Sequence, residues 1–141
     1  MLISSPLDHF HRLHNDVLGL LDRARPHLNG RDAGSWTALA PFRDELGAAL
    51  QALQVYKHRE IFEPILLEGG ERAVIAKQLK VACIQLGLDY QAYKREWVSA
   101  DIDARWAEYR LAGLAMMRQI RERMAEQDVA IQRLFPPSAR G

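Results

Sequence analysis

Apolar residues recur every three or four positions along almost the whole chain, and no segment alternates with the two-residue period of a strand. This spacing places apolar side chains on one face of an α-helix. It predicts four long helices, at about residues 5–28, 35–67, 71–97 and 101–134, followed by a flexible tail at 136–141. Each helix carries an apolar stripe that must be buried against the others. The expected fold class is therefore all-α: one domain, an antiparallel up-down-up-down four-helix bundle.

Local signals mark the expected helix ends. Ser5 followed by Pro6 is typical of an N-cap and a first helical position. Ser99 or Asp101 is the expected cap of the fourth helix. Pro64 is expected to bend or end the second helix, so the sequence does not fix which residues face inward after His58. In the third helix the expected inward stripe is Ile75, Leu79, Ala82, Leu86, Tyr90, Tyr93 and Trp97. Three tryptophans near helix ends, Trp36, Trp97 and Trp106, are expected to seal the bundle.

Composition narrows the class of protein. The chain has 141 residues and a formal net charge of +1, which argues against a nucleic-acid binder and against a polybasic membrane anchor. No apolar run approaches the roughly 20 residues of a membrane span, and the first residues do not resemble a signal peptide. The single cysteine, Cys83, suits a reducing compartment. We therefore expect a cytoplasmic protein that binds neither nucleic acid nor membrane.

The histidines carry the candidate chemistry. All five lie between His9 and His58, and His14 falls on the apolar face of the first helix. A metal site inside a bundle needs inward ligands from several helices. The candidate metal ligands are the histidines His14 and His58 and the carboxylates Glu60 and Glu126. The alternative for His14 is a buried histidine bonded to a neighbour, and the alternative for His58 is a surface histidine.

Three segments resemble bacterial hemerythrin-like (HHE cation-binding) domains. Residues 8–17 (DHFHRLHNDV) are similar to the first helix of that family. Residues 56–66 (YKHREIFEPIL) resemble the second helix, and 126–136, which end in Leu-Phe-Pro, resemble the end of the fourth. The resemblance implies a hemerythrin-like bundle, whose relatives hold a non-haem di-iron centre with histidines and carboxylates from all four helices.

Carried over by position, that ligand set is incomplete here. His14 matches the first-helix histidine. The second-helix His-x-x-x-Glu falls on Gln54 and His58. The fourth-helix histidine falls near Glu126, followed by Ala130 in place of a carboxylate, and the third-helix histidines have no counterpart. The resemblance therefore implies the fold and argues against an oxygen-carrying di-iron site.

Several functions remain open at this stage. The first is a non-catalytic bundle that acts as a small binding, sensing or interaction protein, with a degenerate metal site and no cofactor. The second is a metal- or oxygen-responsive protein with a reduced site around His14, for which iron is the expected metal. The third is phosphotransfer through His11, because residues 11–17 resemble the phosphoacceptor box of some sensor histidine kinases.

Two further features bear on ligands and partners. Cys83, Tyr90, Tyr93 and the methionines could line a pocket between the third and fourth helices. The segment 111–117 (LAGLAMM) is apolar around nearly a full turn. It is either a fully buried helix segment or one side of a homodimer. The sequence names no protein partner, and it carries no phosphate-binding loop or nucleophile elbow, so we do not expect an enzyme.

Overall fold

The computed structural model describes residues 5–29, 34–98, 102 and 104–135, without the side chains of 34–37 and 98. These residues form α1 (Pro6–Leu28), α2 (Gly34–Tyr56), the π-helix η1 (Lys57–Phe62), α3 (Glu63–Glu68), α4 (Gly70–Val98) and α5 (Trp106–Arg133). The helices α2, η1 and α3 follow one another without a break. The described part of the chain therefore contains four long helical segments and no strand, which confirms the predicted all-α class.

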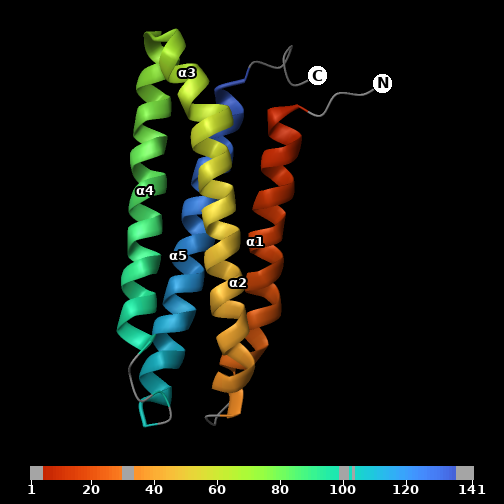
Figure 1. The fold of residues 1–141 in the computed structure, drawn as a ribbon, viewed down its shortest axis with the longest axis vertical. Helices are drawn as coiled ribbons and strands as arrows, with labels where there is room; N and C mark the ends of the chain where they lie inside the picture. The colour runs from red at the N-terminus through yellow and green to blue at the C-terminus, as the bar shows by residue number, and fades with distance from the viewer. Residues whose placement is uncertain (1–4, 30–33, 99–101, 103, 136–141) are drawn as a thin grey trace.

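The four segments lie side by side along one long axis (Figure 1). The start of α1, the end of α5 and α3 lie at the same end of the molecule, and the start of α2 lies at the other end. Helix α1 packs against α2 and α5, whereas α4 packs against α2, η1, α3 and α5. The apolar stripes meet along the middle of this arrangement.

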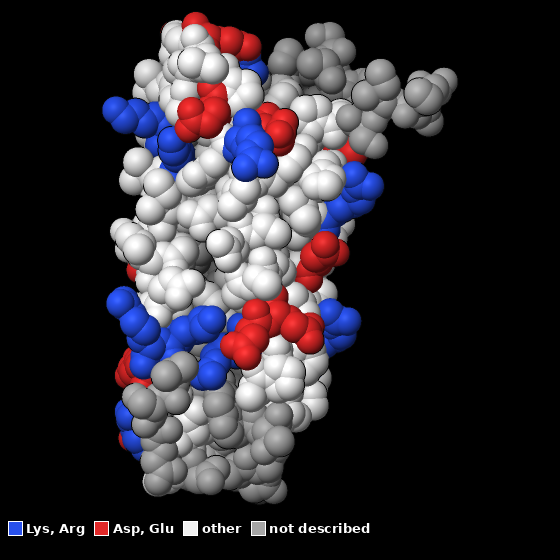
Figure 2. Space-filling model, in the orientation of Figure 1, with Lys and Arg blue, Asp and Glu red and all other residues white. Residues whose placement is uncertain are grey.

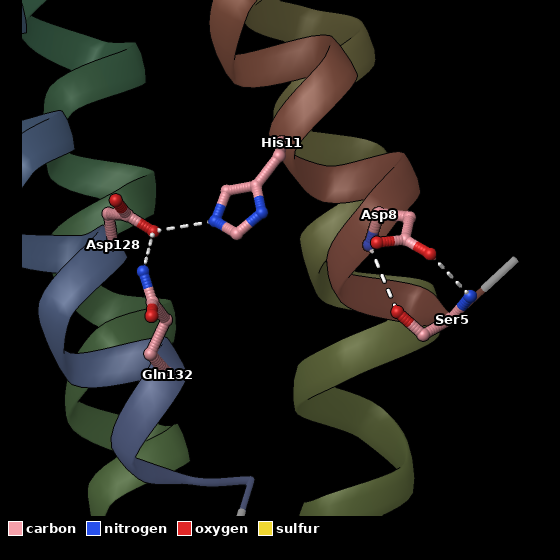
Figure 3. Close-up of polar contacts among 5 residues, drawn as sticks. All are labelled: Ser5, Asp8, His11, Asp128 and Gln132. Carbon is pink, nitrogen blue, oxygen red and sulfur yellow. Dashed lines mark hydrogen bonds and ion pairs between the residues drawn. The ribbon is translucent and has the colours of Figure 1, made fainter. Parts of the chain in front are cut away.

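The predicted start of the first helix is confirmed. The Ser5 hydroxyl accepts a hydrogen bond from the Asp8 backbone N–H at 3.2 Å, and the Asp8 carboxylate accepts one from the Ser5 backbone N–H at 3.1 Å (Figure 3). This reciprocal pair is a capping box, which satisfies two backbone donors at the helix end. Gly69 lies between α3 and α4, and Gly70 is the first residue of α4. Their φ values of +75° and +80° fall in a region that other residues rarely enter.

The fourth long helix begins later than predicted. It starts at Trp106 rather than near residue 101, and Arg105 precedes it without a side-chain cap. Both expected capping residues, Ser99 and Asp101, lie outside the described residues. Ile102 is buried within the preceding turn. An apolar contact therefore anchors this connection in the core, which a search for polar caps does not detect.

Both ends of the bundle have apolar cores. Phe10, Leu21, Leu53, Ile61 and Phe62 are fully buried in the larger core cluster. At the end where α4 meets α5, a second cluster includes Leu28, Leu39, Trp97, Trp106 and Tyr109. The predicted sealing role is confirmed for Trp97 and Trp106, whereas the Trp36 side chain lies outside the described residues.

The predicted inward stripe of the third helix is wrong at Ile75 and Ala82, whereas Leu79 is half-buried against the core. Ile75 is 41% exposed and Ala82 is exposed, while Ala76 and Cys83 occupy the buried positions beside them. The second half, from Leu86 to Trp97, is inward as predicted, with Leu86, Tyr90 and Trp97 buried and Tyr93 half-buried. The error has a physical cause: α4 is apolar on several sides, so periodicity does not select one face. Its exposed apolar residues are Val74, Ile75, Val81, Ile84 and Leu88.

A π-helix determines which residues face inward after His58, a point that the sequence left open near Pro64. The Glu63 backbone N–H donates to the His58 carbonyl, five residues back, instead of the usual four. Pro64 has no N–H, and its ring would crowd the carbonyl of Glu60 in a regular α-helix. The wider turn relieves this crowding and shifts the inward face by about one residue.

The apolar segment 111–117 is divided between core and surface. Gly113 and Met116 are buried, whereas Leu111 and Ala115 are exposed. A homodimer through this segment stays a prediction.

Candidate functional site

Polar side chains from all four long segments approach one another inside the bundle. We call His14 of α1, Lys57 of η1, Cys83 of α4 and Gln127 of α5 the polar layer. His14 is 8% exposed, and Lys57 and Gln127 are each 4% exposed. These three are the buried polar or charged residues among those that the structure describes. Burying such groups opposes folding unless they find partners, so their gathering at one level marks a candidate site.

Lys57 is the most unusual member of the polar layer. Its ammonium nitrogen Nζ donates a hydrogen bond to Gln127 Oε1 at 2.5 Å, and it also contacts the Cys83 thiol. Within the described ranges, no carboxylate forms an ion pair with it. Burial lowers the pKa of Lys57, because a charged ammonium is costly to hold away from water. Burial likewise raises the pKa of the Cys83 thiol, an effect that nearby Lys57 partly opposes.

Gln127 completes the contact from the opposite side. Its Oε1 accepts from Lys57, but its Nε2 is buried and has no hydrogen-bond partner in the structure. A buried donor without a partner is costly, and the polar layer therefore has unused capacity to hydrogen-bond an oxygen atom.

A second polar group lies at the edge of this layer. His11 on α1 reaches across to Asp128 on α5, with Nε2 and Oδ1 separated by 3.1 Å (Figure 3). Gln132 donates to the same carboxylate oxygen at 3.0 Å. Burial lowers the pKa of His14, whose ring stands edge-on to Phe10, and Asp128 partly opposes that effect.

The four candidate metal ligands do not share one place in the interior. His14 is buried as predicted, but Glu60 and Glu126 are exposed, and Glu126 accepts a hydrogen bond from Arg123 at 2.9 Å. His58 is half-buried beside Phe62, with its Nε2 buried and unpaired. In the described part of the chain, no three His, Cys, Asp or Glu side chains gather so that they could hold a metal ion. Iron binding around His14 stays a prediction from the sequence.

Phosphotransfer through His11 also stays a prediction. Its side chain is 40% exposed, so a partner protein could approach the ring. However, Nε2 faces Asp128, and a phosphoryl donor would have to use the other ring nitrogen or break that contact.

A cleft of about 300 Å³ opens between α2 and α4, beside the polar layer. Lys57 and Cys83 lie on its wall, together with Met124 of α5. The rest of the wall combines apolar side chains with amides, including Leu50, Leu53, Leu86, Gln51, Gln54 and Gln91. Figure 2 shows the corresponding face: its middle is free of Lys, Arg, Asp and Glu, which gather above and below, and it is hollowed. A cleft of this size and composition is typical of small-molecule sites.

Two glycines shape this cleft. A Cβ atom on Gly87 would lie 3.0 Å from Gln54 Oε1, and one on Gly47 would lie 3.4 Å from a ring carbon of Tyr90. Each glycine thus makes room for a long side chain from the facing helix. Larger residues at these positions would push those side chains into the cleft or move the helices apart.

The pocket predicted between the third and fourth helices is divided in two. Tyr90, Tyr93, Met116 and Met117 border a space of only about 30 Å³, too small for an organic ligand. Cys83 lies instead on the larger α2–α4 cleft, which Tyr90 also borders. The prediction therefore contained three of the cleft residues, Cys83, Tyr90 and Met124, but placed the cleft between the wrong helices.

Sequence reasoning missed Lys57 and Gln127 as functional residues. Both stand at stripe positions: Lys57 follows Leu53 by four residues, and Gln127 lies between Met124 and Ile131. The sequence signal that could have identified them is the presence of a lysine and a glutamine at positions where an apolar residue is expected.

No family model, curated protein or solved structure matches this chain. The similarity to hemerythrin-like domains therefore rests on the three sequence segments alone. None of the described helices is long and apolar enough to cross a membrane.

Proposed function

We propose that this chain is a non-catalytic, hemerythrin-like up-down-up-down bundle that binds a small apolar molecule in the α2–α4 cleft. The positions of the helix ends in Figure 1 support this topology. Ligand binding would let the bundle act as a sensing or interaction protein, because α4 forms one wall of the cleft and also presents exposed apolar residues to a partner. These residues include Val74, Val81 and Leu88.

The observation that carries this proposal is the composition of the cleft wall. Leu50, Leu53 and Leu86 offer apolar contact, while Gln51 and Gln91 offer amide hydrogen bonds. Apolar burial supplies most of the affinity of a small ligand, and a few polar groups fix its orientation. The expected ligand is therefore a mainly apolar molecule with one or two polar atoms.

A fluorescent probe tests the proposal. N-phenyl-1-naphthylamine is neutral and apolar, and its emission rises when it leaves water. We expect saturable binding of about one probe per chain. In Gly87→Leu the new side chain meets Gln54 and fills the cleft, so we expect at least a tenfold weaker affinity. Leu50→Trp fills the same cleft from α2 and provides a second variant.

The matched control is Gly19→Leu on α1. A Cβ atom there meets nothing within 4 Å, so this variant adds the same side chain away from the cleft. It should bind the probe like the unchanged protein, and circular dichroism should show all three variants to be helical. Absence of saturable binding, or equal binding by folded cleft-filled and control variants, would overturn the proposal.

A further inference from the structure

Lys57 combines three properties that seldom occur together. The residue is only 4% exposed, yet it lies on the wall of a cleft of about 300 Å³. Its nitrogen is held by the neutral oxygen of Gln127 rather than by a carboxylate. A lysine that only stabilised the fold would gain more from an anionic partner or from exposure to water.

The surroundings of Lys57 favour its neutral amine. Burial disfavours the ammonium, and the described neighbours that touch Nζ are an amide and a thiol, neither of which is an anion at neutral pH. A neutral amine carries the lone pair that makes lysine a nucleophile, and desolvation is a known means of activating it. Two of the other three lysines differ: Lys77 is exposed, and Lys80 is paired with Glu63 at 2.6 Å.

We propose that Lys57 binds carbonyl compounds covalently and reversibly, and that the α2–α4 cleft takes medium-length aldehydes or ketones with an apolar chain. This inference rests on the proposed function, since the apolar chain of the ligand would occupy the cleft. The leucines that line the cleft contact that chain, and the carbonyl carbon lies at Lys57 Nζ.

The chemistry needs no oxidant, reductant or metal. The Nζ lone pair attacks the carbonyl carbon, a C–N bond forms, and the carbonyl π electrons move to oxygen. A proton passes from nitrogen to that oxygen and gives a hemiaminal. Loss of water then leaves a C=N bond, so amine and carbonyl give imine and water. The Cys83 thiol, which contacts Nζ, is placed to relay the proton, and the unpaired Nε2 of Gln127 can donate to the hemiaminal oxygen.

Reductive trapping tests the proposal on the unaltered protein. Octanal at limiting concentration is added near pH 7 with sodium cyanoborohydride, which converts an imine to a stable secondary amine. Peptide mapping by mass spectrometry then compares the four lysines, Lys57, Lys77, Lys80 and Lys94. We expect Lys57 to be modified at least about tenfold faster than Lys77, because burial lowers the pKa of Lys57 and so raises the fraction of neutral, nucleophilic amine near pH 7.

Two variants and a competition make the result specific. Lys57→Met retains the apolar stem and should lose the adduct, whereas Lys77→Met should retain it. Gly87→Leu should slow modification of Lys57 because the cleft is filled. Octanal should displace N-phenyl-1-naphthylamine from the unaltered protein.

The outcomes separate this inference from the proposed function. Saturable probe binding and displacement by octanal, without preferential modification of Lys57, would overturn the inference and leave the cleft as a non-covalent site. Modification at equal rates on Lys57 and Lys77 would also overturn it. Failure of the probe to bind would instead remove the proposed function on which the inference rests.

Discussion

At the scale of single residues, the polar layer is the least expected feature of the core. His14 was predicted to face inward from its position between Phe10 and Val17, and its burial confirms that prediction. The lysine and glutamine that meet across the bundle follow from the same periodicity, but their contact depends on the relative rotation of two helices far apart in sequence. The apolar pattern of one helix does not predict how that helix is rotated relative to another.

The buried histidine predicts a dependence of stability on pH. Burial lowers the pKa of His14, and the nearby Asp128 carboxylate partly opposes that effect. Below pH 6.5 the unfolded chain therefore binds a proton more readily than the folded chain. The free energy of unfolding should fall as the pH drops through 6.5 toward the lowered pKa, by an amount on the order of 1 kcal/mol.

Urea unfolding at pH 7 and pH 5 measures this effect. His14→Gln removes the titrating ring, so the loss of stability between the two pH values should be smaller in the variant. Burial also lowers the pKa of His58, and the double variant with His58→Gln should show a smaller loss than either single one. An identical loss in the unaltered protein and in His14→Gln would contradict the assignment.

At the scale of elements, a glycine-to-alanine substitution should change the free energy of unfolding in opposite directions at two positions, Gly69 and Gly19. Gly69 has φ of +75°, and a Cβ atom added there would meet no atom within 4 Å, so an alanine suffers only backbone strain. Gly69→Ala should lower the free energy of unfolding by about 1 kcal/mol. Gly19 lies within α1 with equally open surroundings, and Gly19→Ala should raise it by about 0.5–1 kcal/mol through helix propensity.

Chemical denaturation of the two alanine variants checks this prediction. The comparison is matched because neither new methyl group meets a neighbour, so only backbone conformation differs. Two changes of the same sign would contradict the helix boundary between α3 and α4.

The helices also show where sequence periodicity succeeds and where it fails. Each predicted helix carries an apolar stripe, and the stripes of α1 and α5 are buried at residues such as Val17 and Ile120. Helix α4 is apolar on several sides, and its inward face was misplaced near Ile75 and Ala82. The π-helix at Lys57–Phe62 arises because Pro64 does not fit the regular hydrogen-bond pattern of an α-helix. Pro64 therefore predicts that the helix is distorted here, but it does not predict that the distortion is a π-helix.

At the scale of the whole molecule, the fold class was predictable and the candidate site was not. Four stripes and short connections are enough to predict a helical bundle. The α2–α4 cleft depends instead on two glycines, Gly47 and Gly87, lying opposite long side chains of a facing helix. The sequence resemblance to hemerythrin-like domains directed attention to a metal at His14, whereas the described contacts place the buried polar layer beside the α2–α4 cleft.

The location of a bound probe tests the central claim most directly. Backbone amide shifts of the ¹⁵N-labelled protein are recorded during titration with N-phenyl-1-naphthylamine. The account predicts that the largest shift changes fall on cleft residues such as Gly47, Gly87 and Gln91, while Gly19 on α1 stays unchanged. Saturable changes centred on another face, or no changes at a probe concentration that saturates fluorescence, would contradict it.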